Sequence, residues 1–286
     1  MKDIITEMRP KQWIKNFFVY AALIFDGRLF QYESFISTTE MFIAFCMTSS
    51  AVYFFNDIFD IELDRLNPKK KCRPIASGAI SRKVGYACAF IFSSIGLYIA
   101  ARINLNCLII LSVYVVLNVL YTVRLKHVVI LDLMIVAACF VLRAVSGALA
   151  STISMTVWFV LCVIFLSLFL IIGKRRDELF MLSANELERG RAVLKFYSLE
   201  LLDQMMTVTA SALVMSYSLF AVDPTTRDHF KMALTVPLVL YGVFYYLYAV
   251  RIKHRGGAPD EMLWRERPIL LTAIIYFVYV IVVRNQ

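Results

Sequence analysis

Residues 41–65 read MFIAFCMTSSAVYFFNDIFDIELDR and contain the two features that decide the fold. Residues 41–55 carry no charged side chain, and they lead without a polar turn into a segment with four acidic residues. A bilayer core about 30 Å thick requires roughly 20 apolar residues per helix, or fewer where polar ends reach the interface. The stretch therefore predicts a membrane helix that ends in a group of carboxylates.

The apolar character extends over the whole chain. Of its 286 residues, 60% are hydrophobic and 18% are charged, whereas soluble domains have about half and about a quarter. This composition excludes a soluble globular enzyme, a disordered chain and a fibrous repeat. The six cysteines include no CxxC pair and the three histidines are scattered, so a zinc or haem site has no support.

Nine apolar runs are long enough to predict membrane helices. We therefore expect an all-α, polytopic membrane protein that forms a single domain over residues 1–286, with its two termini on opposite sides of the membrane. The predicted spans are 13–30, 41–55, 84–101, 105–123, 128–150, 155–172, 205–222, 232–250 and 269–283.

Basic residues are distributed unequally about these spans. The N-terminal segment and the loops after even-numbered spans hold 24 of the 30 Lys and Arg residues, the opposite side holds five, and Arg143 lies inside a span. Loops rich in Lys and Arg face the cytoplasm. We therefore predict a protein of the inner membrane with a cytoplasmic N-terminus and an outer C-terminus. Because the cations alternate with apolar runs, they do not predict nucleic-acid binding.

The acidic residues after the second span form the main candidate site. If the helix continues, Asp57, Asp60 and Asp64 lie on one face at i, i+3 and i+7, bordered by Asn56. Carboxylates on one face repel each other unless a cation joins them, and Mg2+ prefers carboxylate oxygens together with substrate phosphates. These four residues are candidate Mg2+ ligands, and the three aspartates are candidate catalytic residues. A solvated acidic helix end is the alternative interpretation.

Cations follow the acids directly, in RLNPKKKCRP at residues 65–74. Arg73 is a candidate phosphate ligand because a guanidinium binds phosphate through two parallel hydrogen bonds. The lysines at 69–71 fit phosphate binding and the anchoring of a cytoplasmic loop equally well. Carboxylates for Mg2+ beside cations for phosphate are the set that a diphosphate leaving group needs.

The N-D-x-x-D-x-x-x-D pattern at residues 56–64, with Arg-Pro at 73–74, resembles the first aspartate motif of the UbiA superfamily of intramembrane prenyltransferases. The resemblance covers essentially the whole chain and implies nine helices around a cavity that faces the cytoplasm. Most members transfer a prenyl group from a prenyl diphosphate and carry a second DxxxD motif after the fourth helix. Here Asp132 is present but position 136 is Val, so the chain departs from that second motif.

Three further segments resemble one branch of the superfamily, the decaprenyl-phosphate phosphoribosyltransferases. They are RPKQWIKN at residues 9–16, LRA at 142–144 with Gly147, and GKRRDEL at 173–179. The resemblance implies Mg2+-dependent transfer of 5-phosphoribose from phosphoribosyl pyrophosphate to a polyprenyl phosphate, in cell-wall biosynthesis. The alternatives are a prenyltransferase with an aromatic or other small acceptor, and a transporter. Acids at one face of the membrane and few Gly and Pro residues disfavour the transporter.

A donor with a diphosphate and a 5-phosphate, and an acceptor with a third phosphate, require polar side chains from several loops. Lys126 joins the candidate catalytic residues. Arg143 and Tyr121 fit structural roles as well. The sequence leaves the oligomeric state open, and a homo-oligomer is compatible with it. The candidate substrate-binding residues are Lys11, Lys15, Asn16, Asn56, Arg73, Tyr121, Asp132, Arg143, Lys174, Arg175 and Glu178.

Overall fold

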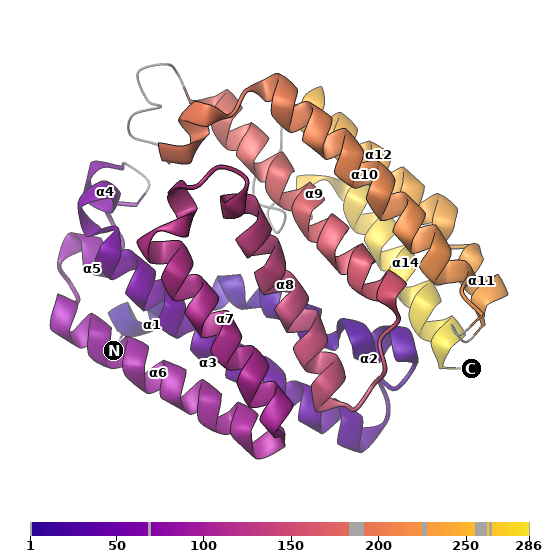
Figure 1. Ribbon diagram of the computed structural model, residues 1–286, viewed down its shortest axis with the longest axis horizontal. Coiled ribbons are helices and arrows are strands. Elements are labelled where there is room, and N and C mark those ends of the chain that lie inside the picture. The colour runs from indigo at the N-terminus through magenta and orange to yellow at the C-terminus, as the bar shows by residue number, and fades with distance from the viewer. Residues whose placement is uncertain are drawn as a thin grey trace.

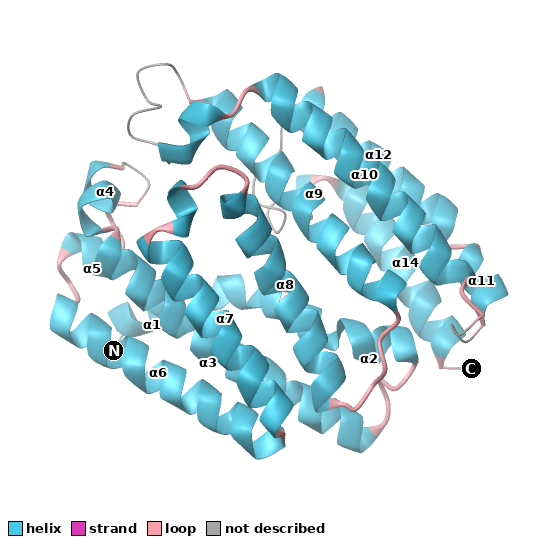
Figure 2. Ribbon diagram, in the orientation of Figure 1, coloured by secondary structure: helices cyan, strands magenta, loops and turns pink. Residues whose placement is uncertain are grey.

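The computed structural model describes residues 2–67, 70–182, 192–224, 228–254, 262 and 265–285. All regular elements within these residues are helices (Figure 2). Eight of them are long and apolar enough to cross a membrane, and they lie side by side, with their axes running from the upper left to the lower right of Figure 1. They are α3 (Tyr32–Phe59), α6 (Arg82–Ile103), α7 (Leu105–Val123), α8 (Leu131–Ala150), α9 (Val157–Met181), α10 (Leu199–Val222), α11 with α12 (His229–Ala233 and Val236–Arg251) and α14 (Arg267–Arg284).

The prediction that residues 13–30, the first of the nine spans, form a regular membrane helix is wrong. This part of the chain is a 3-10 helix, η1 (Pro10–Tyr20), followed by the short helix α2 (Ala21–Asp26), which ends at Gly27 with a left-handed φ of 75°. The described residues therefore hold eight candidate membrane helices and not nine. An apolar run does not distinguish the two helix types, and the polar Asn16 near its start is buried.

The η1–α2 segment still runs antiparallel to α3. The Trp13 indole N–H donates to Ser50 Oγ at 3.1 Å, and the Tyr20 hydroxyl donates to Thr39 Oγ1 at 2.9 Å. A 3-10 helix rises about 2 Å per residue, compared with about 1.5 Å in an α-helix. The stretched winding lets this short segment reach from the end of the bundle that carries the acidic motif to the opposite end.

Gly147 of α8 allows η1 to pack directly on that helix. A Cβ atom at Gly147 would overlap the carbonyl oxygen of Val19. A larger residue would therefore push η1 away from α8. The close contact with Val19 is the physical reason for the glycine at position 147, shortly after residues 142–144.

Short elements close the acidic end of the bundle, where α4 and α5 appear at the left of Figure 1. Because α9 continues past the predicted span to Met181, Lys174 and Arg175 lie on the same helix as its apolar part. The short elements at this end are α1 (Lys2–Met8), α4 (Ile61–Leu66), α5 (Pro74–Ser77), η2 (Leu125–His127) and η3 (Ala192–Phe196).

Candidate active site

The acidic motif spans a helix break. Helix α3 ends at Phe59, Asp60 caps it, and α4 begins at Ile61. The backbone N–H of Asp60 donates to the Asn56 carbonyl at 3.0 Å, and that of Asp64 donates to the Asp60 carbonyl at 2.8 Å. The condition for three aspartates on one uninterrupted helix is therefore not met, because Asp60 interrupts the helix with φ −95° and ψ 11°, although both hydrogen bonds have the i to i−4 spacing of an α-helix.

Asp57 and Asp64 point into the protein and share a cation. Their side chains are 1% and 2% exposed. Arg73 Nη1 donates to Asp57 Oδ1 at 3.2 Å and to Asp64 Oδ2 at 2.5 Å. Arg9 also pairs with Asp57, and Lys70 Nζ lies 3.6 Å from Asp64 Oδ1. Buried carboxylates are tolerated when cations with good geometry compensate them, so Arg73 holds the acids together in this structure.

Asp60 and Asn56 contact a different part of the chain. Lys126 Nζ of η2 pairs with Asp60 Oδ1 at 2.5 Å, and the Thr122 hydroxyl of α7 donates to Asn56 Oδ1 at 3.3 Å. The Asp60 side chain is 19% exposed. The connection between α7 and α8 therefore packs on the acidic motif and contacts residues of it other than those held by Arg73.

A second polar group surrounds Arg175 of α9. Its Nε donates to Asp132 Oδ2 at 3.0 Å, its Nη1 donates to Glu178 Oε2 at 2.8 Å, and its Nη2 lies 3.5 Å from the Tyr121 hydroxyl. The Tyr197 hydroxyl donates to the other Asp132 oxygen at 2.8 Å. Four predicted residues therefore meet here, with Tyr197 as a member that the sequence did not indicate.

The end of α7 and η2 join the two groups. Tyr121 contacts the Arg175 group, whereas Thr122 and Lys126 contact the acidic motif. The candidate site is thus one continuous polar region. The predicted residues that it contains are Asn56, Asp57, Asp60, Asp64, Arg73, Tyr121, Lys126, Asp132, Arg175 and Glu178.

Asn16 and Arg143 form a separate network inside the bundle. Arg143, which is 6% exposed, donates through Nε to Asn16 Oδ1 at 2.8 Å, through Nη1 to the Cys139 carbonyl at 2.8 Å and through Nη2 to the Tyr114 hydroxyl at 2.9 Å. No carboxylate pairs with it among the residues that the structure describes. These contacts tie η1 and α7 to α8.

The remaining predicted lysines lie at the edges of the region. Lys11 is exposed, and no hydrogen bond or ion pair joins its side chain to another described residue. Lys15 donates to the Gln12 side chain, one turn earlier in η1. Lys174 is half-buried beside Arg175 on α9. Lys11 therefore joins neither of the two groups in this structure.

The donor set suits a hard cation that substrate oxygens help to bind. Within the described ranges, no group of three or more His, Cys, Asp and Glu side chains is arranged to enclose a metal ion. Mg2+ commonly takes one or two protein carboxylates and completes its shell with water and substrate phosphates. The acidic motif is therefore compatible with a Mg2+–diphosphate platform and not with a closed metal cage.

Glu7 of α1 adds a carboxylate that the sequence did not indicate. It is 1% exposed, and neither of its side-chain oxygens accepts a hydrogen bond from a described residue. Burial and the neighbouring Asp57 carboxylate raise the pKa of Glu7 to about 8 from 4.5. Glu7 is far from Asp57 along the chain, so the sequence does not indicate that the two carboxylates are neighbours. The turn at Arg9 brings α1 to the acidic end of the bundle.

This shift predicts pH-dependent stability. The folded protein retains a proton on Glu7 that the unfolded chain releases above its ordinary pKa. The resulting stabilisation is complete below about pH 4.5 and is lost as the pH rises through about 8, up to a limit of about 5 kcal/mol. In EDTA, the thermal midpoint of Glu7→Gln should therefore exceed that of the wild type increasingly between pH 5 and 9. A difference in thermal midpoint between the two proteins that does not change with pH would contradict the raised pKa of Glu7.

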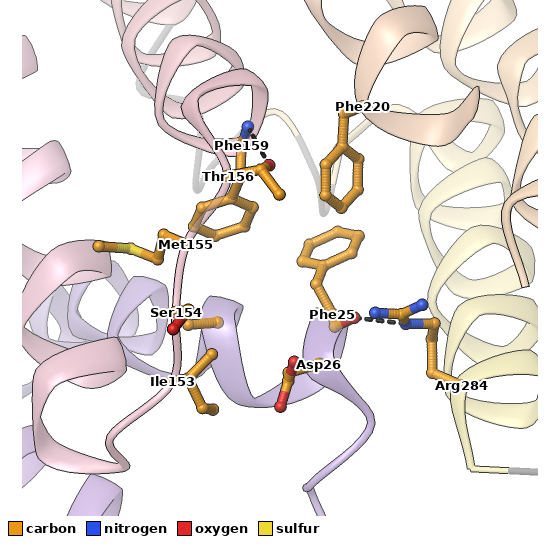
Figure 3. A pocket seen from close by; sticks show the side chains of 10 residues that line it. Phe25, Asp26, Ile153, Ser154, Met155, Thr156, Phe159, Phe220 and Arg284 are labelled. Atoms are coloured by element: carbon orange, nitrogen blue, oxygen red, sulfur yellow. Dashed lines mark hydrogen bonds between the residues drawn. The ribbon is translucent and has the colours of Figure 1, made fainter. Parts of the chain in front are cut away.

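A cavity of about 70 Å3 lies far from this region, at the other end of the bundle (Figure 3). Phe25 of α2 packs there against both Phe159 and Phe220, with ring centroids 5.7 and 5.6 Å away. Arg284 at the end of α14 donates to the Phe25 carbonyl. The C-terminal helix thus ends opposite the acidic motif.

Comparison with known proteins agrees with this geometry. The model of the UbiA prenyltransferase family matches residues 17–265. A decaprenyl-phosphate phosphoribosyltransferase of Corynebacterium glutamicum is 34% identical over 281 residues, which cover 96% of this chain and 84% of the relative. One from Mycobacterium tuberculosis is 30% identical over 282 residues, covering 96% of this chain and 91% of the relative.

Solved structures show the same fold. The structure of a UbiA homolog from Archaeoglobus fulgidus bound to GPP and Mg2+ superposes with a TM-score of 0.77 at 16% identity, covering 99% of this chain and 100% of that one. The chain is a multi-pass membrane protein, and it belongs to the UbiA prenyltransferase family.

Proposed function

We propose that this protein transfers 5-phosphoribose from phosphoribosyl pyrophosphate to a polyprenyl phosphate and releases pyrophosphate. The observation that carries the proposal is the nearly full-length similarity, at 30–34% identity, to decaprenyl-phosphate phosphoribosyltransferases. The continuous polar region at one end of the bundle supports it, because it combines carboxylates with several cations. We further propose that the whole chain, residues 1–286, is a single transferase domain.

Mg2+ is the cofactor that the site fits. The carboxylates of Asp57, Asp60 and Asp64 and the amide oxygen of Asn56 are oxygen ligands, the type that this ion prefers. When bound together with the pyrophosphate group, the ion would neutralise charge that develops on the leaving group. The chain contributes the carboxylates that hold the ion and the cations that hold the phosphates.

The basic side chains orient the donor and the acceptor. Arg73 and Lys126 contact different carboxylates of the acidic motif, and both are proposed contacts of the pyrophosphate. Arg175 and Lys174, with Lys11 and Lys15, are the proposed contacts of the donor 5-phosphate and the acceptor phosphate. A prenyl diphosphate with a neutral acceptor would need fewer cations, which favours the phosphoribosyl reaction over prenyl transfer.

We propose a single displacement at the anomeric carbon of the ribose. An oxygen of the acceptor phosphate forms the new C–O bond while the bond to pyrophosphate breaks. The acceptor is already anionic at pH 7, so the protein does not need to remove a proton from it. Holding the two substrates in line supplies much of the rate enhancement. The configuration should invert from α in the donor to β in the product, and NMR of the lipid product tests this.

The orientation in the inner membrane follows from the charge distribution. The acidic end carries most of the basic residues, so it faces the cytoplasm. The N-terminus lies at this end and α14 ends at the other (Figure 1). We therefore propose a cytoplasmic N-terminus and a C-terminus on the outer side. Single cysteines introduced at Lys2 and Asn285, in a variant that lacks the six native cysteines, test this orientation by labelling in intact cells.

The test of the activity uses purified protein in detergent with labelled phosphoribosyl pyrophosphate and decaprenyl phosphate. Label should move into the organic phase with Mg2+ and remain in the aqueous phase with EDTA. Transfer that persists in EDTA would contradict the proposed role of the acidic motif.

A further inference from the structure

Ile130 has a backbone conformation that needs support. It lies just before α8 with φ 70° and ψ −45°. A positive φ is a genuine outlier for a β-branched side chain, and such conformations persist only where the surroundings hold them. The residue lies between Lys126, which pairs with Asp60, and Asp132, which pairs with Arg175. The strained turn therefore connects the two halves of the candidate site.

The Tyr197 hydroxyl supports this turn. It accepts a hydrogen bond from the Ile130 N–H at 2.8 Å and donates one to Asp132 Oδ1 at 2.8 Å. The second Asp132 oxygen accepts from Arg175 Nε at 3.0 Å. Asp132 is 0% exposed, so each of its oxygens depends on one of these two partners among the described residues. One hydroxyl thus fixes both the turn and the carboxylate that holds Arg175.

The Tyr197 side chain is itself fixed by packing. It is 6% exposed and belongs to the same buried cluster as Val193 and Leu133. Val193 is 0% exposed and Leu194, whose carbonyl accepts from the Tyr197 N–H at 3.2 Å, is 2% exposed. Burial raises the pKa of Tyr197 to about 12, so the hydroxyl keeps the proton that it donates to Asp132.

We propose that Tyr197 is a positioning residue for the transfer reaction. Its hydroxyl holds the Ile130 turn and the Asp132 carboxylate, and through them it sets Lys126 against Asp60 and presents Arg175 to the substrate phosphates. The identity of the reaction in this proposal rests on the proposed function. The two hydrogen bonds that Tyr197 makes do not depend on that function.

The informative variant is Tyr197→Phe, which removes the hydroxyl and keeps the ring in the core. Tyr279→Phe is a matched control, because the Tyr279 hydroxyl donates to the Lys231 carbonyl at 3.1 Å at the other end of the bundle. We expect Tyr197→Phe to lower kcat/KM for phosphoribosyl pyrophosphate about tenfold to hundredfold. Its thermal midpoint should also fall below that of Tyr279→Phe, because the change leaves the Ile130 N–H and one oxygen of the buried Asp132 without their partner. A kcat/KM equal to that of the control would overturn the proposal.

A double-mutant cycle tests whether Tyr197 acts through Asp132. Tyr197→Phe should cost much less activity in an Asp132→Asn background than in the wild type, because residues in one hydrogen-bonded network are not additive. Additive losses would show that Tyr197 acts by another route. A merely structural role of the ring predicts no loss in Tyr197→Phe and a loss in Tyr197→Leu.

Hydrogen exchange separates this proposal from the assigned reaction. In detergent, Tyr197→Phe should accelerate amide exchange in a peptide that covers Ile130–Asp132, and Tyr279→Phe should not. If the wild type transfers no phosphoribose, the proposed function fails, and faster exchange would still establish that Tyr197 holds the turn. Unchanged exchange in Tyr197→Phe would overturn the positioning role whichever substrate the enzyme uses.

Discussion

Replacing Asp60 by Asn is expected to lower phosphoribosyl transfer at least about a thousandfold and to change the thermal midpoint little. Asp60 is the partly exposed carboxylate of the motif, and Lys126 is the partner that the structure gives it. Its charge is therefore available to a Mg2+–diphosphate group. The change in stability stays small because Asn keeps the shape of the side chain and removes one negative charge from a group of neighbouring carboxylates, which offsets the loss of the charged pair with Lys126. Label transfer from phosphoribosyl pyrophosphate into lipid measures the activity, and thermal unfolding in the same detergent measures the stability.

Glu62→Gln is the matched control for Asp60→Asn. Glu62 lies two residues further along, but its side chain is 75% exposed and pairs with Arg65 at 3.6 Å and Arg82 at 3.3 Å. It should retain the transfer rate of the wild type. Equal losses in both variants would mean that overall negative charge at this helix end matters and not the position of Asp60.

Replacing Arg73 by Ala is expected to reduce both activity and stability. The change removes the cation shared by Asp57 and Asp64, which leaves two buried carboxylates with only Arg9 and Lys70 as charged partners among the described residues. Removing one partner of a buried ion pair typically costs about 3–5 kcal/mol. The thermal midpoint should fall by several degrees, and transfer should fall at least about a hundredfold.

Two further measurements identify the cause of that loss. Arg73→Lys keeps the charge but lacks the planar fork, so it should lie between Arg73→Ala and the wild type in both properties. Added Mg2+ should raise the midpoint of Arg73→Ala more than that of the wild type, because the ion can join the two carboxylates. Arg82→Ala, at a side chain that is 62% exposed, serves as the control. A wild-type midpoint for Arg73→Ala would contradict the buried-pair interpretation.

Most of the fold was predictable because the length of an apolar run directly indicates a helix that crosses a membrane. The predicted span 105–123 coincides with α7, and the other long helices lie where apolar runs indicated them. The first span was not predictable in the same way. Its apolar content fits a regular helix, whereas the buried Asn16 and the contact with Gly147 belong to a 3-10 segment packed on α8.

The site was predictable where spacing along the chain determines proximity. Asp57 and Asp64 lie together with Arg73 as expected, because a short loop returns Arg73 to the helix end. The orientation of Asp60 toward Lys126 depends on the break between α3 and α4, which the helical spacing does not encode. Glu7 and Tyr197 arrive from distant segments, and each is a single residue without a motif, so only tertiary packing places them there.

The central claim is that this member of the UbiA family uses a sugar diphosphate and not a prenyl diphosphate as donor. The most direct measurement compares two donors with the same purified protein and Mg2+. One reaction contains labelled phosphoribosyl pyrophosphate and decaprenyl phosphate, and the other contains a labelled prenyl diphosphate and 4-hydroxybenzoate. The account predicts labelled lipid phosphate in the first reaction and no prenylated product in the second. Transfer in the second reaction alone would contradict it.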